Sequence, residues 1–429
     1  MRFDDEWKQY TLGEILVPKG YIRGPFGSAL KRNEMLTEGI PVYEQQHAIY
    51  GIRDFRFFID DKKLEEMKRF QVQTDDLIIS CSGTVGKVSI IEKEDQKGII
   101  SQALLLLRVN RDIILPQYLK YFFLSKEGHA SITSRSSGSV QVNISKRADI
   151  EKIPLRIPSI AKQQEIVAIL SVLDDKINNN NKINQRLEET ARAIFKSWFI
   201  YFEPYQDEEF VKSELGYIPS KWSVAPLSAF CSFITRGITP KYTESGEQIV
   251  LNQKCIRGHQ VNLGPSRYHV PKVINEKWLQ FGDVLVNSTG QGTLGRVAQW
   301  LENATNVTVD SHISIVRPGE KYYIYYIGQF LMGKEREIES MAAGSTGQTE
   351  LSRERLGSLL LVSPKIEQLR EFSKLVEPMM IKIASNNHEN EKLTKLRDTL
   401  LPKLLSGELL IPNAGSETNE RSNNNGRSR

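Results

Sequence analysis

The chain has 429 residues, a length sufficient for two or three domains. Of these residues 40% are hydrophobic and 25% charged, a composition typical of globular proteins. No apolar run reaches membrane-spanning length and the N-terminus MRFDDEWKQY lacks a secretory core, so we expect a cytoplasmic protein without a membrane partner. Three cysteines without paired spacing argue against disulfides and zinc, and the net charge of +5 weakly favours a polyanionic partner.

The first 158 residues are predicted to form a mixed α/β domain. Short β-branched runs separated by Gly, Pro and Asn indicate strands, and residues 116–130 look helical. One phrase stands out near the middle, Asp76-Leu-Ile-Ile-Ser-Cys-Ser-Gly-Thr-Val-Gly-Lys87. It has an apolar run, a loop of small residues with two glycines, and a basic residue, which is typical of a strand followed by a tight loop.

A long helix is predicted over residues 159–203, because Ala161 to Phe202 contains neither Gly nor Pro and its apolar residues step by four and three. This heptad pattern predicts a coiled-coil seam. The seam residues are Ile166, Leu170, Leu173, Ile177, Asn180, Asn184, Leu187, Ala191, Ile194 and Trp198. The alternative is a helical hairpin with its turn at 178–181, since four consecutive Asn are poor helix formers.

After a linker at 204–220, residues 221–364 repeat the first domain. Asp283-Val-Leu-Val-Asn-Ser-Thr-Gly-Gln-Gly-Thr-Leu-Gly-Arg296 matches the earlier loop phrase 207 positions on (283 − 76 = 207), with a two-residue insertion. Ile249 to Ile256 likewise matches Val42 to Ile49 (249 − 42 = 207), and residues 322–341 look helical. Ordered matches of this kind indicate an internal duplication, and therefore a second mixed α/β domain.

A second long helix is predicted over residues 365–411, followed by a disordered tail at 412–429 that is rich in Ser, Asn, Arg and Glu. Pro378 and Pro402 interrupt this helix, so we expect a kink or a helix start at Pro378 and a bend or an end at Pro402. The seam residues are Phe372, Val376, Met379, Ile383, Asn386, Asn390, Leu393, Arg397, Leu400 and Leu404.

Both seams carry two central asparagines 206 positions apart (386 − 180 = 206). Buried Asn in a seam costs stability but specifies register. Either a parallel or an antiparallel pairing would bring these asparagines together. The connectivity favours the antiparallel one, because it allows the two globular copies to lie at opposite ends.

The order of domain, long helix, domain, long helix resembles the specificity subunits of type I restriction–modification systems. The resemblance covers nearly the whole chain except the tail, and it is carried by five phrases in order. They are Gly24-Pro-Phe-Gly27-Ser28, Ser82-Gly-Thr-Val-Gly86, Ala193-Ile-Phe-Lys-Ser-Trp198-Phe199, Gly216-Tyr-Ile-Pro219 and Leu396-Arg-Asp-Thr-Leu-Leu-Pro402-Lys-Leu-Leu-Ser-Gly-Glu408.

The resemblance implies an α+β fold with pseudo-twofold symmetry: two tandem target-recognition domains separated by two helices that form an antiparallel coiled coil. Each domain would read one half of a bipartite site in double-stranded DNA, and the helices would set the spacer. Two modification subunits would dock on the helices, and restriction subunits would join them. S-adenosylmethionine, ATP and Mg²⁺ would then be bound by those partners, and this chain would hold no cofactor.

Candidate base-reading side chains are polar residues of the repeated loops, because Gln and Asn suit adenine and Arg and Lys suit guanine. An ordinary surface polar role is the alternative for each of them. The candidates in the first domain are Gln45, Gln46, His47, Ser82, Thr84 and Lys87, and those in the second are Asn252, Gln253, Lys254, Ser288, Thr289, Gln291 and Arg296. In addition, Arg23, Lys31 and Arg32 are candidates for phosphate contacts.

Enzymatic motifs are missing from the sequence. There is no phosphate-binding Gly-x-x-x-x-Gly-Lys-Ser/Thr loop, no Asn-Pro-Pro-Tyr/Phe methyltransferase motif and no metal-ligand spacing among the six histidines. We therefore predict a non-catalytic chain. A coiled-coil scaffold that binds proteins without DNA specificity is the alternative, and an autonomous DNA enzyme with scattered carboxylates is a third hypothesis.

Overall fold

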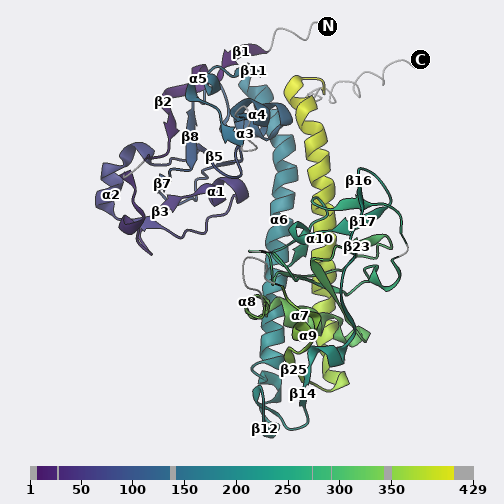
Figure 1. Ribbon diagram of the computed structural model, residues 1–429. Helices are drawn as coiled ribbons and strands as arrows, with labels where there is room; N and C mark the ends of the chain where they lie inside the picture. Colours follow the sequence, from purple (N-terminus) through teal and green to yellow (C-terminus); the bar gives the residue numbers. More distant parts are fainter. Residues whose placement is uncertain are drawn as a thin grey trace, which may run out of the picture. The chain divides into compact units, whose positions relative to one another are not determined.

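The computed structural model describes residues 7–26, 29–135, 142–272, 274–290, 292–342 and 350–409 (Figure 1), so the tail predicted at 412–429 lies outside the described residues. The chain forms two compact units, each made of a mixed α/β domain and adjoining parts of two long helices. Unit 1 comprises the described residues of Met1–Ile177 and Lys392–Arg429, and unit 2 comprises those of Asn178–Glu391. The units therefore differ from the predicted sequential blocks, because their boundaries fall inside both long helices.

The first domain is built on a four-stranded antiparallel sheet in the order β2-β8-β5-β6. Its central strands β5 (Leu77–Ser80) and β8 (Leu104–Val109) are almost entirely buried, so they are continuous apolar runs in the sequence. Helix α3 (Pro116–Leu124) packs on β6. The other elements are β1 (Lys8–Thr11), β2 (Leu16–Arg23), β3 (Ile40–Tyr43), α1 (Gln45–Tyr50), β4 (Phe58–Ile59), α2 (Asp61–Glu66), β6 (Val88–Ile90), β7 (Ile99–Ile100), α4 (Lys126–Ile132), β9 (Thr133–Arg135), β10 (Val142–Ile144), α5 (Arg147–Ile150) and β11 (Pro154–Ile157).

The second domain repeats this topology with the sheet order β15-β24-β21-β22. A parallel strand pair beside the sheet also recurs, β3 with β7 in the first domain and β17 with β23 in the second. The elements are β12 (Phe210–Ser213), β13 (Gly216–Pro219), β14 (Ser223–Pro226), β15 (Cys231–Arg236), β16 (Tyr242–Thr243), β17 (Gln248–Leu251), β18 (Ile256–Arg257), β19 (Gln260–Val261), β20 (Arg267–His269), β21 (Val284–Asn287), β22 (Val297–Gln299), β23 (Val307–Val309), β24 (Ile313–Pro318), α7 (Ile324–Met332), α8 (Glu335–Ser340), α9 (Arg353–Gly357) and β25 (Leu360–Ser363). The predicted duplication is thus present in the fold.

Each of the two sheets contains its own buried ion pair, and the two pairs lie at equivalent positions. Asp76, just before β5, accepts two hydrogen bonds from Arg108 at 2.8 and 2.7 Å, and Asp283, just before β21, accepts two from Arg317 at the same distances. Both carboxylates are fully buried. Burial raises the pKa of each carboxyl, and the facing guanidinium opposes that shift. A bidentate pair of this kind fixes the strand that leads into the loop phrase.

Helices α6 (Ile160–Phe199) and α10 (Ile366–Ser406) lie side by side and antiparallel (Figure 1). In unit 1, Arg397 donates to Asp174 at 2.9 Å, and in unit 2, Asn386 donates to Asn184 at 2.7 Å. Within unit 2, Asn180 faces Asn390 and Asn184 faces Asn386, so the residue numbers rise on one helix as they fall on the other and the pair is antiparallel. The asparagines do meet across the seam, where Asn180 donates to Asn390 at 2.9 Å.

Both helices are continuous. Residues 178–181 lie within α6, which confirms the predicted long helix and shows that the hairpin alternative is wrong. Helix α10 begins at Ile366 and runs through Pro378, so no helix starts at that proline, and it ends at Ser406 beyond Pro402. Pro378 is exposed. Packing of the surrounding turns against α6 and the second domain offsets the local cost.

The seam drifts away from a strict heptad toward the helix ends. Phe195 and Phe199 are buried while Ile194 and Trp198 are partly exposed. A straight helix turns about 20° per heptad relative to a 3.5-residue repeat, so the buried stripe moves around it. Residues of this stripe also pack into the hydrophobic cores of the domains.

On α10 the same drift buries Met380 and Leu401, whereas Met379 and Leu400 were predicted. The remaining predicted seam positions lie in the seam or at its margin. They are buried at Ile166, Leu170, Asn180, Asn184, Ala191, Phe372, Val376, Ile383, Asn386 and Leu404, and half-buried at Leu173, Ile177, Leu187, Asn390, Leu393 and Arg397.

Candidate functional site

The loop after β5 is shaped by its own hydrogen bonds. The Ser80 hydroxyl donates to the Thr84 carbonyl at 2.5 Å and accepts from the Lys87 amide at 3.0 Å. Gly83 and Gly86 adopt left-handed φ angles of 61° and 79°, which other residues avoid. The turn therefore directs the side chains at positions 82, 84 and 87 into solvent, where all three are exposed.

Helix α1 supports this loop through a hydrogen bond. The Gln45 side chain accepts a hydrogen bond from the Ser82 amide at 3.1 Å, and Gln46 donates to the Asp54 carbonyl at 3.1 Å. His47 is fully buried; Nδ1 accepts from the Glu44 amide at 2.6 Å and Nε2 lies 3.0 Å from the Asp54 carbonyl. Burial lowers the pKa of His47, so the neutral ring is favoured. The prediction that His47 reads bases is corrected: its ring belongs to the core.

In the second domain, hydrogen bonds hold the corresponding loop in a similar way. Gln253, in the 3₁₀ turn η7 (Gln253–Cys255), donates to the carbonyl and hydroxyl of Thr289 at 2.5 and 2.6 Å. Asn252 caps that turn and donates to the Pro265 carbonyl at 2.6 Å. Ser288 is fully buried and bonded to Ser314, so its predicted role in base reading is also corrected. These residues position the loop.

Two predicted residues remain on the surface of the second loop region. Lys254 is exposed, and Arg296 is half-buried with one guanidinium nitrogen donating to the Gly292 carbonyl at 2.8 Å. Gln291 lies outside the described residues. The structure therefore brings loop and turn together in each domain, and five predicted side chains can face a partner: Ser82, Thr84, Lys87, Lys254 and Arg296. Among the residues predicted to contact phosphate, Lys31 and Arg32 are exposed and Arg23 is half-buried.

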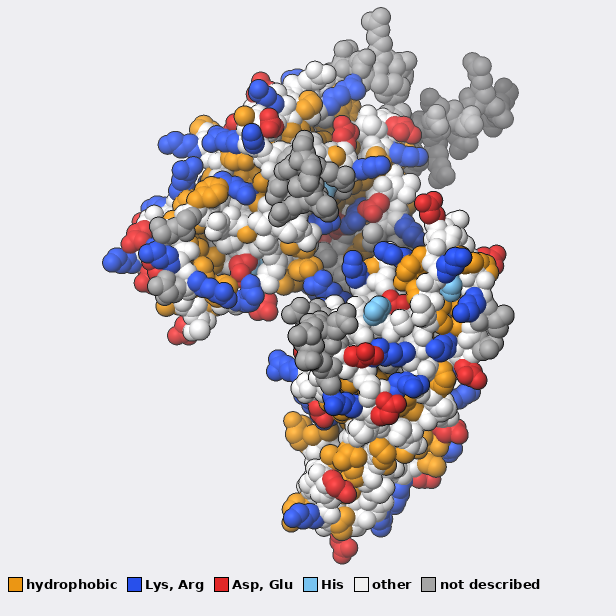
Figure 2. Space-filling model, viewed as in Figure 1, with side chains coloured by type: hydrophobic (Ala, Val, Ile, Leu, Met, Phe, Trp, Pro, Cys, Tyr) orange, Lys and Arg blue, Asp and Glu red, His pale blue; other side chains and the backbone are white. Residues whose placement is uncertain are grey.

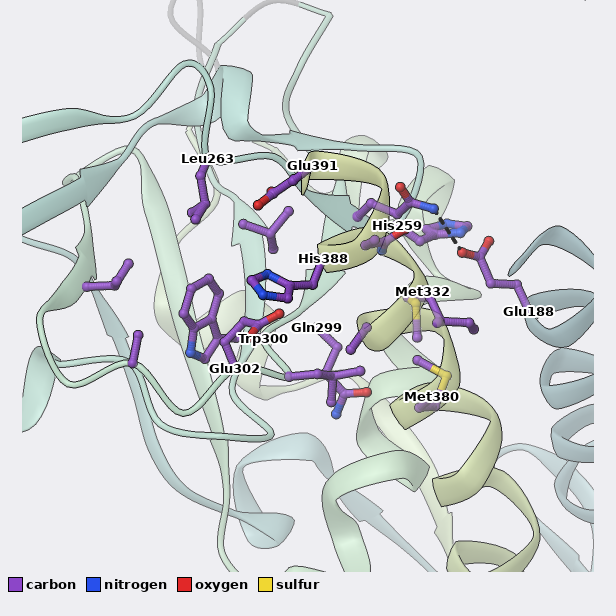
Figure 3. A pocket seen from close by; sticks show the side chains of 18 of the residues that line it. Glu188, His259, Leu263, Gln299, Trp300, Glu302, Met332, Met380, His388 and Glu391 are labelled. Carbon is purple, nitrogen blue, oxygen red and sulfur yellow. Dashed lines mark hydrogen bonds between the residues drawn. The ribbon is translucent and has the colours of Figure 1, made fainter. Parts of the chain in front are cut away.

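A pocket of about 290 Å³ in unit 2 lies between β-strand loops and the two helices (Figure 3). Among its described lining residues are three glutamates, Glu188, Glu302 and Glu391, one arginine, Arg192, and apolar side chains such as Trp300. The Glu188 carboxylate accepts a hydrogen bond from Gln260 at 3.3 Å, and burial raises the pKa of Glu188 and of Glu302. A pocket with this lining disfavours phosphate, so it is not where a nucleic-acid backbone would bind.

On the face drawn in Figure 2, Lys and Arg side chains are scattered among apolar side chains and among Asp and Glu. The described residues contain no cluster of His, Cys, Asp or Glu suited to a metal ion. In the part of the chain that the structure describes, no helix combines the length and apolarity needed to cross a membrane.

Sequence reasoning missed the ion pairs Asp76–Arg108 and Asp283–Arg317. The sequence did contain a signal for these pairs, because an aspartate and a later arginine recur in the same order in both repeats. That signal identifies a contact only when the strand after the aspartate and the strand that carries the arginine are known to be neighbours. It also missed Arg236, which pairs with Glu350 at 2.7 Å. No sequence pattern places these two residues together.

Known proteins match this fold and sequence. Residues 4–189 match the model of the type I restriction modification DNA specificity domain. The chain is 28% identical to the type I restriction enzyme MjaIX specificity subunit of Methanocaldococcus jannaschii, with 71% of each protein covered. It is 23% identical to the HindI specificity subunit of Haemophilus influenzae, covering 76% of this chain and 84% of that one. The crystal structure of a type I S subunit from M. genitalium has the same fold, with a TM-score of 0.54 at 16% identity, covering 94% and 98% of the two chains.

These comparisons agree with one another. A family model matches the first part of the chain, the matches to the two relatives cover most of their length, and the solved structure has the same fold. The chain is therefore similar to type I restriction–modification specificity subunits, and its residues 4–189 match the DNA specificity domain of that family.

Proposed function

We propose that this chain selects the DNA site of a type I restriction–modification complex, with each domain reading one half of a bipartite sequence. The observation that carries the proposal is the duplicated loop: a small-residue turn that follows a central strand of the sheet, anchored by the same ion pair in both domains. Because the two loops carry different side chains, the two half-sites should differ in sequence.

The helix pair would set the distance between half-sites and would carry the modification subunits. Each helix of about 40 residues spans about 60 Å, which corresponds to roughly 17 base pairs of duplex. A rod of this length suits half-sites about one helical turn apart. Exposed apolar residues beside α6, Ile200 and Tyr201, are 50% and 59% exposed and offer part of such a docking surface.

Chemistry would then reside in other chains. The modification subunits would bind S-adenosylmethionine and methylate adenine, and the restriction subunits would use ATP and Mg²⁺ for translocation and cleavage. This chain's own contribution is sequence choice, through hydrogen bonds to base edges from the presented loops.

Lys87→Ala and Arg296→Ala test the assignment as a matched pair, because both residues follow the glycine loop, one in each domain. Each substitution is expected to relax one half-site only and to cost about 1–3 kcal/mol of discrimination there. The measurement is methylation of a library of duplexes by the assembled complex carrying each variant, with the other variant as its control. Equal weakening at every duplex would instead mean that the side chain contacts phosphate, and unchanged selectivity in both would refute the loop assignment.

A further inference from the structure

A second surface feature of the first domain lies apart from the glycine loop, and we name it the basic pocket. It is an open depression of about 280 Å³ between the end of β2, the 3₁₀ turn η4 (Lys68–Phe70) and the segment that enters α5. Of the seven lining residues that the structure describes, four are cationic and none is acidic. The lining residues are Tyr21, Arg23, Arg69, Ile144, Ser145, Lys146 and Arg147.

Arg23, a lining residue of the basic pocket, has a guanidinium nitrogen without a hydrogen-bond partner among the described residues. That nitrogen, Nη1, is buried. The guanidinium lies near the Cys81 thiol, a neutral neighbour whose pKa burial raises to about 11. Arg147 stacks over the Tyr21 ring at 5.0 Å and donates to Glu151 at 2.8 Å, so an acid partly offsets that charge. A buried donor without an acceptor is costly, and an anion would satisfy it.

In the second domain, the arginine at the equivalent position is bonded by residues of the chain itself. Arg236 ends β15 as Arg23 ends β2, and each is followed by a glycine whose amide donates to the first residue of the neighbouring strand. Arg236 pairs with the Glu350 carboxylate at 2.7 Å and donates to the Leu351 carbonyl at 2.7 Å. The chain therefore supplies its own anion in this domain.

Glu350 has no acidic counterpart in the first domain. The offset of 207 positions between the repeats matches Glu350 to Asn143 (350 − 207 = 143) and the buried Leu351 to Ile144 (351 − 207 = 144). Ile144 lines the basic pocket and packs against the core of the first domain. The acid that neutralises the arginine in the second domain is thus absent from the first, and the basic pocket keeps its charge.

We propose that the basic pocket binds a phosphate oxyanion, and that its source is a phosphodiester of the DNA backbone beside the first half-site. The proposal rests on the DNA-binding function above and adds a named phosphate contact to it. Arginine suits this role because its planar fork of donors matches phosphate oxygens. Such a contact positions the domain on the duplex without reading sequence, and it releases counterions when it forms.

The first test measures how binding of the assembled complex to its target duplex depends on salt. Arg23→Gln is expected to weaken binding roughly tenfold and to reduce the slope of log affinity against log salt by about 0.9, the value for one phosphate. Lys146→Gln, at an exposed position that does not threaten folding, should reduce the slope in the same direction. Site selectivity should be retained in both.

The second test adds an acid to the basic pocket and removes the acid that pairs with Arg236 in the second domain. Ile144→Glu should place an acid beside Arg23 and reproduce the reduced slope without removing any cation. Glu350→Ile, at an exposed position, should free Arg236 and increase the slope. Melting temperatures of all variants show whether the fold survives.

The outcomes separate the two proposals. If the wild-type complex binds its target selectively but the slopes of all four variants equal the wild-type slope, the basic pocket is not a phosphate site while the proposed function stands. If the wild type shows no selective binding, the proposed function itself fails. A wild-type chain stabilised by inorganic phosphate in an Arg23-dependent way, with an unchanged DNA slope, would overturn the backbone source and assign the pocket to free phosphate.

Discussion

Removing one heptad from both helices is expected to shorten the preferred spacer of the DNA site by about three base pairs. Deleting residues 178–184 and 386–392 takes out segments that face each other, so the pairs on either side keep their partners. Seven residues rise about 10.5 Å, and base pairs advance about 3.4 Å each. Methylation of duplexes whose spacers vary one base pair at a time measures the shift.

The shortened protein should also bind more weakly. A change of three base pairs turns one half-site about 100° around the duplex, whereas one heptad turns the helix pair by only about 20°. DNA twisting must absorb the difference. An insertion of seven residues at the same two places is the control and should lengthen the spacer by a similar amount. An unchanged spacer in both variants would show that the helices do not set it.

Removing the arginine of a buried ion pair is expected to give the largest loss of stability. Arg317→Ala leaves Asp283 with no side-chain exposure and no cation, which should lower the free energy of unfolding by about 3–5 kcal/mol. Arg108→Ala should cost less, because the side chain of Arg108 is 26% exposed against 12% for Arg317. Urea denaturation followed by tryptophan fluorescence measures both losses.

The loss should depend on pH in a defined direction. Burial raises the pKa of Asp283, and without Arg317 no cation opposes that shift. The folded state then binds a proton more tightly than the unfolded state, so the destabilisation is greatest above the folded pKa. It shrinks as the pH falls through that pKa toward the ordinary carboxyl range.

Two variants control this experiment. Asp283→Asn combined with Arg317→Leu removes both charges and should recover much of the loss, because the Gln280 amide keeps an acceptor. Arg353→Ala removes an exposed arginine and should change stability by less than about 0.5 kcal/mol. If Arg317→Ala were as mild as Arg353→Ala, the buried pair would not support the sheet.

The duplication and the long helices could be predicted because each leaves a repeated pattern in the sequence. The offset of 207 positions places equivalent strands in both domains, and the four-and-three spacing survives the asparagines at the centre of α6. The helix ends were less predictable. Tertiary packing, and not the heptad, decides that Phe195 and Phe199 are buried while Ile194 and Trp198 are not.

Individual site residues could not be assigned from polarity alone. A polar loop residue looks the same in a sequence whether its side chain faces solvent or core, and His47 and Ser288 turn out to be buried and hydrogen-bonded. Likewise, Pro378 predicts a break in an isolated helix, yet α10 passes through it because neighbouring turns pack on the second domain. Contacts between distant segments decide these cases.

Methylome sequencing of a host that carries the complete system, compared with the same host lacking this chain, is the most direct test. We expect chain-dependent methylation at a motif of two defined segments flanking a constant stretch of unspecified bases. Methylation at one uninterrupted motif, or an identical pattern without the chain, would contradict the role of this chain in choosing a bipartite site.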